Sequence, residues 1–324
     1  MKAVRGFIVA CLGASLLAFA GASPAQDWPA KPIRLIVPFA PGGGTDILAR
    51  LMAPKLSAAL GQQLVIENKP GAASIIGTQM VAQAAPDGYT LLMVDSSFII
   101  NPGLRTDLPY DSLKDLAPVV HLATGPVILV AHPSLKADTV RELVDQAKAA
   151  PGTLFYGSGG NGASTHLAGE LFNLAAGTRI SHVPYKGTGE AFAAVLANQV
   201  PLTFAGISSA RPALEAGKLK ALALTGQERN PAVPDVPTFD EAGLPGVDSS
   251  THWQMLAPAG TPREAIQRLN TEINKVLKDP GIAERVAGLG YVPAGGTPED
   301  LSRLDVEEIA KWRKVIQAAN ISIQ

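Results

Sequence analysis

Residues 33–50 read IRLIVPFAPGGGTDILAR, and this stretch predicts a strand, a glycine-rich loop and a helix in that order. The residues Ile33–Val37, apolar except for Arg34, are typical of a buried strand that ends at Pro38. A glycine-rich turn follows at residues 42–44, and a helical pattern begins after Thr45 and Asp46. Glycines let the backbone approach a ligand, and the first turn of a helix has unpaired N–H groups and partial positive charge. The stretch therefore predicts a small anion site.

Residues 1–25 have the pattern of a secretory signal peptide. Lys2 and Arg5 give a positive start, residues 7–20 are apolar, and small residues follow as far as Ala25. Cleavage after Ala25 is preferred to cleavage after Ala22. An uncleaved membrane anchor is disfavoured because the apolar run is shorter than the roughly 20 residues that span a bilayer. The chain is therefore expected to be exported to the periplasm.

The composition of the exported chain excludes several classes of function. Cys11, the only cysteine, lies in the middle of the apolar run, so the remaining 299 residues have no thiol for a disulfide, nucleophile or metal site. They carry 25 basic and 28 acidic residues without a basic stripe, which argues against nucleic-acid binding. The histidines lack metal-ligand spacing, so neither a metal nor another cofactor is expected. Two domains are expected from the length.

Apolar strand-like runs alternate with helical patterns along the chain. The expected strands are residues 33–37, 64–67, 90–94, 127–131, 153–156, 200–204, 219–224 and 253–257. The helical stretches between them include residues 47–60, 74–84, 140–149, 165–175, 189–198 and 263–277. This order predicts an α/β fold with mainly parallel sheets. Thr139 and Thr261 are expected helix N-caps, with Pro262 in the first helical position. Pro54 is expected to kink or divide its helix.

A second glycine loop repeats the arrangement of the first. Residues 153–172 read TLFYGSGGNGASTHLAGELF, which predicts a short strand, a loop, and a helix opened by Ser164 or Thr165. Two sheets that each point a helix N-terminus into one cleft would hold a small anion from both sides.

Two nucleotide-binding patterns are incomplete. Gly157, Gly159 and Gly162 satisfy G-x-G-x-x-G, but the next strand lacks the acidic residue that would hold a ribose. The glycines at residues 42–44 lack the Gly-Lys-Ser/Thr that completes a P-loop.

Two further groups of polar residues lie near the second glycine loop. Ser158 and Ser164 lie near His166, but there is no G-x-S-x-G elbow of a hydrolase, and Ser164 and His166 fall on different faces of the expected helix. His166 is therefore interpreted as a packing or helix-surface residue. Tyr185 and Lys186 either face a cleft and orient a carboxylate or belong to an exposed Pro/Gly turn. The sequence leaves both interpretations of this pair open.

Several segments, in this order, resemble the Bug (TctC-type) extracytoplasmic solute-binding receptors of tripartite tricarboxylate transport systems. The resemblance covers the whole mature chain and is carried by these segments: WPAKPIRLIVPFAPGGGTDILAR (28–50), GQQLVIENKPGA (61–72), APDGYTLLM (85–93), YGSGGNGASTHLAGELF (156–172), HVPYKGTGEA (182–191), AGKLKALALTGQERNPAVPDVPTFDEAGLPG (216–246) and LAPAGTP (256–262).

This resemblance implies a two-lobed periplasmic binding protein, or Venus flytrap, in which each lobe is a mainly parallel sheet flanked by helices. Residues 26–124 and 253–324 would form the first lobe, and residues 125–252 the second. The implied function is non-enzymatic: the receptor captures a small carboxylated molecule between its lobes and delivers it to membrane permease subunits. A sensor-kinase ectodomain is an alternative partner, as in a two-component system. Two competing hypotheses are an orphan binding protein without a transporter and an exported serine hydrolase that uses Ser158 or Ser164.

Ligand contacts carry over from the resemblance residue by residue. In the first lobe the implied contacts are Phe39, Ala40, Pro41, Gly42, Gly43, Ser96 and Ser97, and Asp95, at the end of the strand expected at residues 90–94, is a further expected contact. In the second lobe they are Ser158, Gly159, Asn161, Ala163, Ser164, Thr165, Tyr185 and Gly187, and Ala205 is a further expected contact. Asp46 is expected to order the start of its helix rather than to touch the anion.

Three positions depart from the family pattern. Pro201 and Ala205 stand where family members often have aspartates, whereas Asp95 stands where they commonly have glycine or another small residue. If Asp95 faces the cleft, it would bind an amine or hydroxyl, or repel a second carboxylate. A small organic acid is the expected ligand, with amino acids and aromatic acids less favoured.

Overall fold

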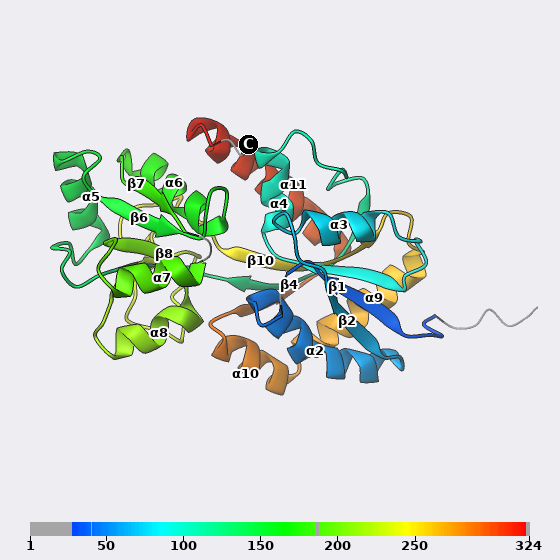
Figure 1. Cartoon of the computed structure of the whole chain (residues 1–324). Helices are drawn as coiled ribbons and strands as arrows, with labels where there is room; N and C mark the ends of the chain where they lie inside the picture. Colours follow the sequence, from blue (N-terminus) through cyan, green and yellow to red (C-terminus); the bar gives the residue numbers. More distant parts are fainter. Residues whose placement is uncertain (1–27, 40, 186–187, 322–324) are drawn as a thin grey trace, which may run out of the picture.

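The computed structural model describes residues 28–39, 41–185 and 188–321. These residues form two β-sheets with helices on both faces of each, and the sheets lie side by side (Figure 1). The expected signal peptide lies outside the described residues, as do Ala40, Lys186 and Gly187. Within the described ranges, no helix is both long enough and apolar enough to cross a bilayer.

The first sheet has the strand order β11-β4-β10-β3-β1-β2. Its strands are β1 (Ile33–Val37), β2 (Leu64–Asn68), β3 (Thr90–Val94), β4 (Leu116–Gly125), β10 (Thr251–Pro258) and β11 (Val292–Gly295). Its helices are α2 (Gly44–Leu60), α3 (Ile75–Ala82), α4 (Ser97–Leu104), α9 (Arg263–Leu277), α10 (Pro280–Gly288) and α11 (Pro298–Ala318).

The second sheet has the strand order β7-β6-β8-β5-β9. Its strands are β5 (Val127–Ala131), β6 (Phe155–Ser158), β7 (Ser181–Pro184), β8 (Leu202–Gly206) and β9 (Lys220–Leu224). Its helices are α5 (Val140–Ala149), α6 (Ser164–Ala176), α7 (Thr188–Leu196) and α8 (Ile207–Glu215).

Strand β1 shows why both faces of the first sheet need helices. Ile33, Leu35 and Val37 belong to the core shared with α2 and α9, whereas Ile36 belongs to the core on the opposite face, with α4 and α11. Side chains alternate between the faces of a strand, so apolar residues on both faces are buried only where helices cover both sides. This requirement explains the expected α/β class.

The two-lobed α/β fold is confirmed, but the sheets are mixed rather than mainly parallel. Strand β1 pairs in parallel with β2 and β3, whereas β10 pairs antiparallel with β3 and β4. In the second sheet, β6 is parallel to β7 and β8, and β5 is antiparallel to β8 and β9. Only Pro126 separates β4 from β5. Two neighbouring parallel strands need a long crossover between them. The single residue between β4 and β5 is too short for such a crossover, so the expected strand–helix–strand order does not hold at this point.

The expectations for helix ends had different outcomes. Thr139 caps α5 in a capping box with Glu142, as predicted. Thr261 does not cap α9: the N-cap is Pro262, and the Thr261 hydroxyl donates to the Pro258 carbonyl oxygen at 2.7 Å. Pro54 does not divide α2, which is continuous from Gly44 to Leu60.

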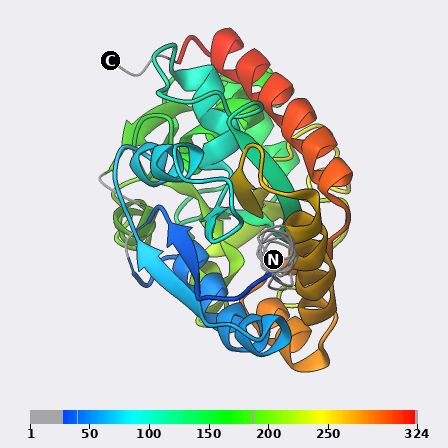
Figure 2. The same ribbon diagram turned by 90° about the vertical axis from the view of Figure 1, so that its right-hand side faces the viewer.

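The C-terminal helix α11 joins the two halves. It runs along one side of the molecule (Figure 2), against α4 and β4 of the first sheet and α6 of the second. Trp312 and Ile316 of this helix share one apolar core with Leu167 and Leu171 of α6. Helix α6 therefore packs on the first half of the molecule, and its first turn, at Ser164, lines the main cavity.

Candidate functional site

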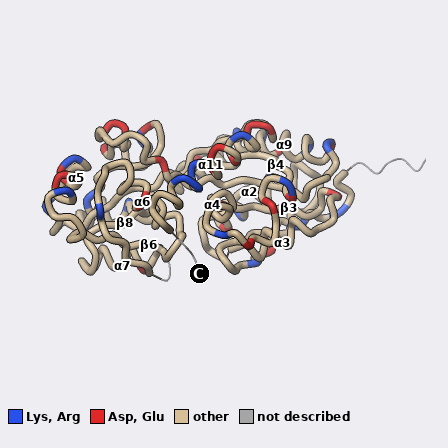
Figure 3. Tube along the Cα trace, turned by 90° about the horizontal axis from the view of Figure 1, so that it is seen from above, with Lys and Arg blue, Asp and Glu red and all other residues tan. Residues whose placement is uncertain are grey.

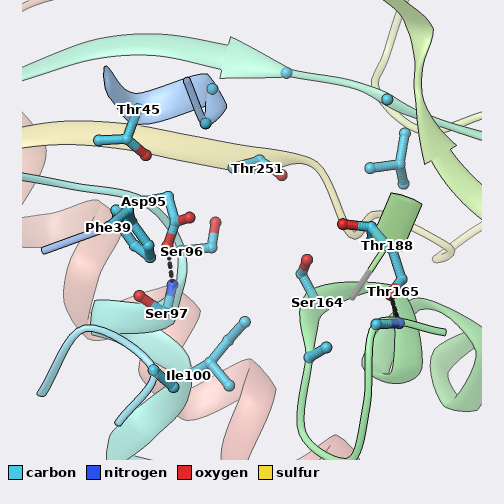
Figure 4. A pocket seen from close by; sticks show the side chains of 18 of the residues that line it. Phe39, Thr45, Asp95, Ser96, Ser97, Ile100, Ser164, Thr165, Thr188 and Thr251 are labelled. Carbon is cyan, nitrogen blue, oxygen red and sulfur yellow. Dashed lines mark hydrogen bonds between the residues drawn. The ribbon is translucent and has the colours of Figure 1, made fainter. Parts of the chain in front are cut away.

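A cavity of about 660 Å³ lies between the two sheets. Figure 4 shows Asp95, Ser96 and Ser97 on one side of it and Ser164 and Thr165 on the other. Residues that directly follow strands β3 and β6, or that open helices α2 and α6, supply much of the lining. The cavity is therefore built from the ends of strands and the starts of helices in both halves.

Two helix starts meet at this cavity without side-chain caps. Gly43 is the N-cap of α2 and Ala163 is the N-cap of α6, and neither makes a side-chain capping bond. Gly44 and Thr45 line the cavity from α2, and Ser164 lines it from α6. The N–H groups of a first helical turn have no partner within the helix and carry about half a positive charge together. These two turns suit a bound anion.

Asp46 orders the first of these turns. Its carboxylate accepts hydrogen bonds from the Gly42 N–H, the Arg50 Nε and the Asn68 Nδ2, each at 2.9 Å. The Asn68 amide also donates to the Phe39 carbonyl oxygen at 3.0 Å, which holds the other end of the loop. Burial opposes ionisation of Asp46, but these hydrogen bonds outweigh it and lower its pKa to about 2. Asp46 does not line the cavity, so its place agrees with the expected structural role.

A buried cluster of polar side chains supports the second glycine loop, between β6 and α6. The rings of His166 and His182 stack with centroids 3.8 Å apart. The Ser158 Oγ lies 2.5 Å from the His182 Nε2, and the His166 Nδ1 accepts the Gly162 N–H at 3.0 Å. The Tyr156 hydroxyl donates to Glu170 at 2.6 Å. His166 is thus a packing residue, as interpreted from the sequence.

Acid is expected to destabilise the chain through this histidine pair. Burial lowers the pKa of His166 and of His182 to about 4, and the charge of His182 lowers that of His166 further. The unfolded chain takes up protons near pH 6.5 and the folded chain near pH 4, so stability falls as the pH drops between these values. The loss is up to about 3 kcal/mol for each histidine. Urea unfolding of His182→Gln at pH 7 and pH 4.5 should show a smaller loss than the parent; an equal loss would contradict this assignment.

Trp253 and Tyr291 form an aromatic wall of the cavity. Their ring centroids are 4.2 Å apart, and the Trp253 indole N–H donates to the Thr45 Oγ1 at 3.0 Å. A Cβ atom at Gly125 would lie 2.6 Å from the Trp253 ring, and one at Gly44 would lie 2.9 Å from the Tyr291 hydroxyl. These two glycines leave room for the aromatic rings beside the start of α2.

The structure separates the predicted contact residues into three groups. Those that line the cavity are Phe39, Gly43, Asp95, Ser96, Ser97, Gly159, Asn161, Ala163, Ser164, Thr165 and Ala205. Pro41, Gly42, Ser158 and Tyr185 do not line it, and Ala40 and Gly187 lie outside the described residues. Ligand contact by any of these residues stays a prediction.

The residues placed away from the cavity have structural reasons for their positions. Ser158 is fully buried and bonded within its own loop. The partly buried Tyr185 ring packs against the core beside α7 and lies 3.2 Å from a Cβ built at Gly157. Pro41 and Gly42 lie on the exposed side of the first loop. Tyr185 is absent from the cavity lining, and its contact with a ligand stays a prediction.

Several cavity residues were not predicted from the sequence. They include Thr188, Ser209, Thr251, Trp253 and Tyr291. Thr251 and Trp253 fall at the second expected crossing between the lobes, at residues 250–253. A cleft between two lobes lies next to the points where the chain crosses from one lobe to the other. Their position at such a crossing could therefore have predicted that Thr251 and Trp253 line the cavity. Tyr291 lies in a turn between α10 and β11, and nothing in its local pattern marks it.

The hydrolase hypothesis gains no support from this geometry. Ser158 is paired with His182, but its side chain has no exposed surface. Ser164 lines the cavity, and no hydrogen bond among the described residues joins it to a histidine. Over the same residues, no group of three His, Cys, Asp or Glu side chains could hold a metal ion.

Charged side chains are sparse around the cavity. Asp95 is the only carboxylate and Arg105 the only cationic side chain among its described lining residues. Elsewhere, lysines and arginines are interspersed with acidic residues in both halves (Figure 3). A bound anion would therefore depend mainly on backbone N–H and hydroxyl groups rather than on a cluster of lysines and arginines.

Comparisons with known proteins agree with this arrangement. Residues 48–321 match the model of the tripartite tricarboxylate transporter family receptor. The solved structure of R. palustris Rpa4515 with adipate is 36% identical, with a TM-score of 0.81, over 91% of this chain and 99% of that one. MatC (Rpa3494) from Rhodopseudomonas palustris, with bound malate, is 34% identical, with a TM-score of 0.76, over 89% and 100%. The periplasmic binding protein BugD is 32% identical, with a TM-score of 0.78, over 92% and 100%.

Proposed function

Because this chain belongs to the tripartite tricarboxylate transporter receptor family, we propose that its cavity captures a small carboxylate in the periplasm for delivery to membrane permease subunits. The related structures with adipate and malate support a carboxylate as the ligand class. The single observation that carries the proposal is the meeting of two uncapped helix starts, at Gly43 and Ala163, in one cavity.

The proposed mechanism is closure of two lobes around the ligand. The lobes are residues 26–124 with 253–324, and residues 125–252, so that the chain crosses between them near Gly125 and Thr251. Contacts from both halves are made together only when the lobes approach, so a ligand shifts the equilibrium towards the closed form. We propose that the permease recognises this closed form after export of the chain by residues 1–25.

Carboxylate binding is tested by thermal unfolding of the mature chain after it has been unfolded and refolded to remove bound ligand. A ligand at 100 times its Kd stabilises by about 2.7 kcal/mol, which raises the melting temperature by a few degrees. The panel contains mono-, di- and tricarboxylates, with amines and sugars of equal size as controls. Stabilisation by carboxylates alone would support the proposal, and stabilisation only by the controls would refute it.

The α6 start allows a sharp test of the anion site. Ser164 is the first helical residue, where proline is tolerated because that N–H has no helical partner. Ala163 has φ −63° and ψ 153°, which suits a residue before proline. Ser164→Pro is therefore expected to keep the helix and remove one N–H donor to the anion. Hydrogen bonds to charged groups contribute about 1.5–3 kcal/mol, so the affinity should fall at least about tenfold.

Two controls accompany this variant. Ser164→Ala keeps the N–H and removes only the hydroxyl, so it should lose less affinity than Ser164→Pro in calorimetric titrations. Equal losses in both variants would show that the hydroxyl, rather than the helix start, binds the ligand. NMR of the ligand after long incubation should recover it unchanged, as expected of a receptor rather than an enzyme.

A further inference from the structure

Asp95 is an unexpected residue for a cavity proposed to bind anions. It follows directly on β3, whose five residues are all buried, and its half-buried side chain lines the cavity (Figure 4). One carboxylate oxygen, Oδ1, accepts the Ser97 N–H at 2.8 Å. Ser97 is its only hydrogen-bond partner in the described part of the chain, and no lysine, arginine or histidine there offsets its charge. The acid is therefore held in place but not neutralised by a cation.

The charge of Asp95 acts on the part of the cavity where an anion would bind. Burial raises the pKa of Asp95 and also that of Tyr291, and the charge of Asp95 raises the pKa of Tyr291 further. The Tyr291 hydroxyl would lie 2.9 Å from a Cβ at Gly44, so it adjoins the start of α2. In its ionised form, Asp95 would repel a plain carboxylate seated on that helix start. A ligand that presents an N–H or O–H to Asp95 would convert this repulsion into a charge-assisted hydrogen bond.

Provided that the cavity binds carboxylates as proposed above, we propose that Asp95 is a specificity residue that selects carboxylates carrying a hydrogen-bond donor, either hydroxyl or ammonium, on the carbon facing it. Ser97 positions the carboxylate of Asp95 through its N–H, which binds Oδ1, and the second oxygen is the proposed acceptor for the ligand. The selectivity is a difference in affinity between two acids that differ only in the donor. The acid without the donor is still repelled by Asp95, and it leaves the half-buried Asp95 carboxylate without a partner in the ligand.

The test uses ligand series in which a single substituent changes. Succinate, malate and aspartate share one carbon skeleton and carry hydrogen, hydroxyl and ammonium at the same carbon. Glutarate and adipate, with their 2-hydroxy and 2-amino derivatives, extend the comparison to longer chains. Calorimetric titration of the refolded mature chain should give at least about tenfold tighter binding for a donor-bearing member than for the plain acid of equal length.

Two Asp95 variants test whether the preference for donor-bearing acids comes from the Asp95 carboxylate. Asp95→Ala removes both oxygens and should abolish it. Asp95→Asn keeps an oxygen for the Ser97 N–H and for a ligand hydroxyl, but loses the charge, so a preference for hydroxyl should survive and one for ammonium should be lost. Asp107→Ala changes an exposed aspartate outside the cavity lining and should keep the parent's ligand ratios. Urea unfolding of each variant confirms that it is folded.

The outcomes separate this inference from the proposed function. If the parent binds plain dicarboxylates as tightly as their donor-bearing partners, or if Asp95→Ala keeps the preference, the role of Asp95 is refuted while carboxylate binding stands. If the parent binds no carboxylate of any series, the proposed function fails and the role of Asp95 fails with it.

Discussion

Asp305→Asn is expected to make the chain more stable at pH 8, by an amount that disappears near pH 4. Asp305 is 2% exposed on α11, and its Oδ1 has no hydrogen-bond partner among the described residues. Burial raises the pKa of Asp305 to about 7, the nearby Gln254 amide opposes the rise, and the charge of Glu308 adds to it. Ionising Asp305 at pH 8 therefore costs the folded state free energy that an uncharged asparagine avoids.

The direction and size of this effect follow from proton linkage. The unfolded chain loses the Asp305 proton near pH 3.9, whereas the folded chain keeps it until about pH 7. Between these values the folded state binds more protons, so stability falls as the pH rises. Three pKa units correspond to about 4 kcal/mol, which is the largest gain expected for Asp305→Asn at pH 8.

Urea unfolding of the parent and Asp305→Asn at pH 4.5 and pH 8 measures this gain directly. The acid sensitivity of the histidines affects both proteins equally and cancels in the difference. Glu307→Gln removes an exposed charge from the same helix and controls for a general charge effect. A gain of the same size at both pH values, or a loss at pH 8, would contradict the assignment.

Gly169→Ala is expected to destabilise the chain by about 3 kcal/mol or more. Gly169 lies inside α6, and a Cβ there would sit 2.2 Å from two ring atoms of Tyr156. The Tyr156 ring is buried, and its hydroxyl is tied to the Glu170 carboxylate at 2.6 Å and to the His166 carbonyl oxygen at 3.1 Å. Since the ring cannot move aside without breaking these bonds, the added methyl group forces the helix away from the sheet.

The control is a helical glycine in open space. A Cβ at Gly288, the last residue of α10, would meet nothing within 4 Å. Alanine is favoured over glycine in helices by up to about 1 kcal/mol, so Gly288→Ala should be neutral or stabilising. Chemical unfolding of both variants under one condition gives the comparison. A stable Gly169→Ala variant would mean that Tyr156 has room to shift.

Local patterns predicted the parts of the fold that depend on neighbouring residues. Strands β1, β3 and β5 and helices α5 and α9 have the predicted bounds, because the short apolar runs of the strands, the apolar period of the helices and the nearby caps or breakers are all local features of the sequence. Strand direction could not be obtained in this way. The pairing of β10 with β3 and β4 joins residues more than 100 positions apart, and no local period specifies it.

The two strand–loop–helix units, at residues 33–50 and 153–172, could be predicted from the amino-acid order alone, and so could the family. Glycine, helix start and apolar strand lie within a few residues of one another, so their geometry is local. The folded structure was needed to show that Trp253 and Tyr291 line the cavity, that the partly buried Tyr185 packs against a core, and that Asp95 lines the cavity with Ser97 as its hydrogen-bond partner. The physical reason is that burial and charge environment arise from side chains brought together by the folded chain, not from their order along it.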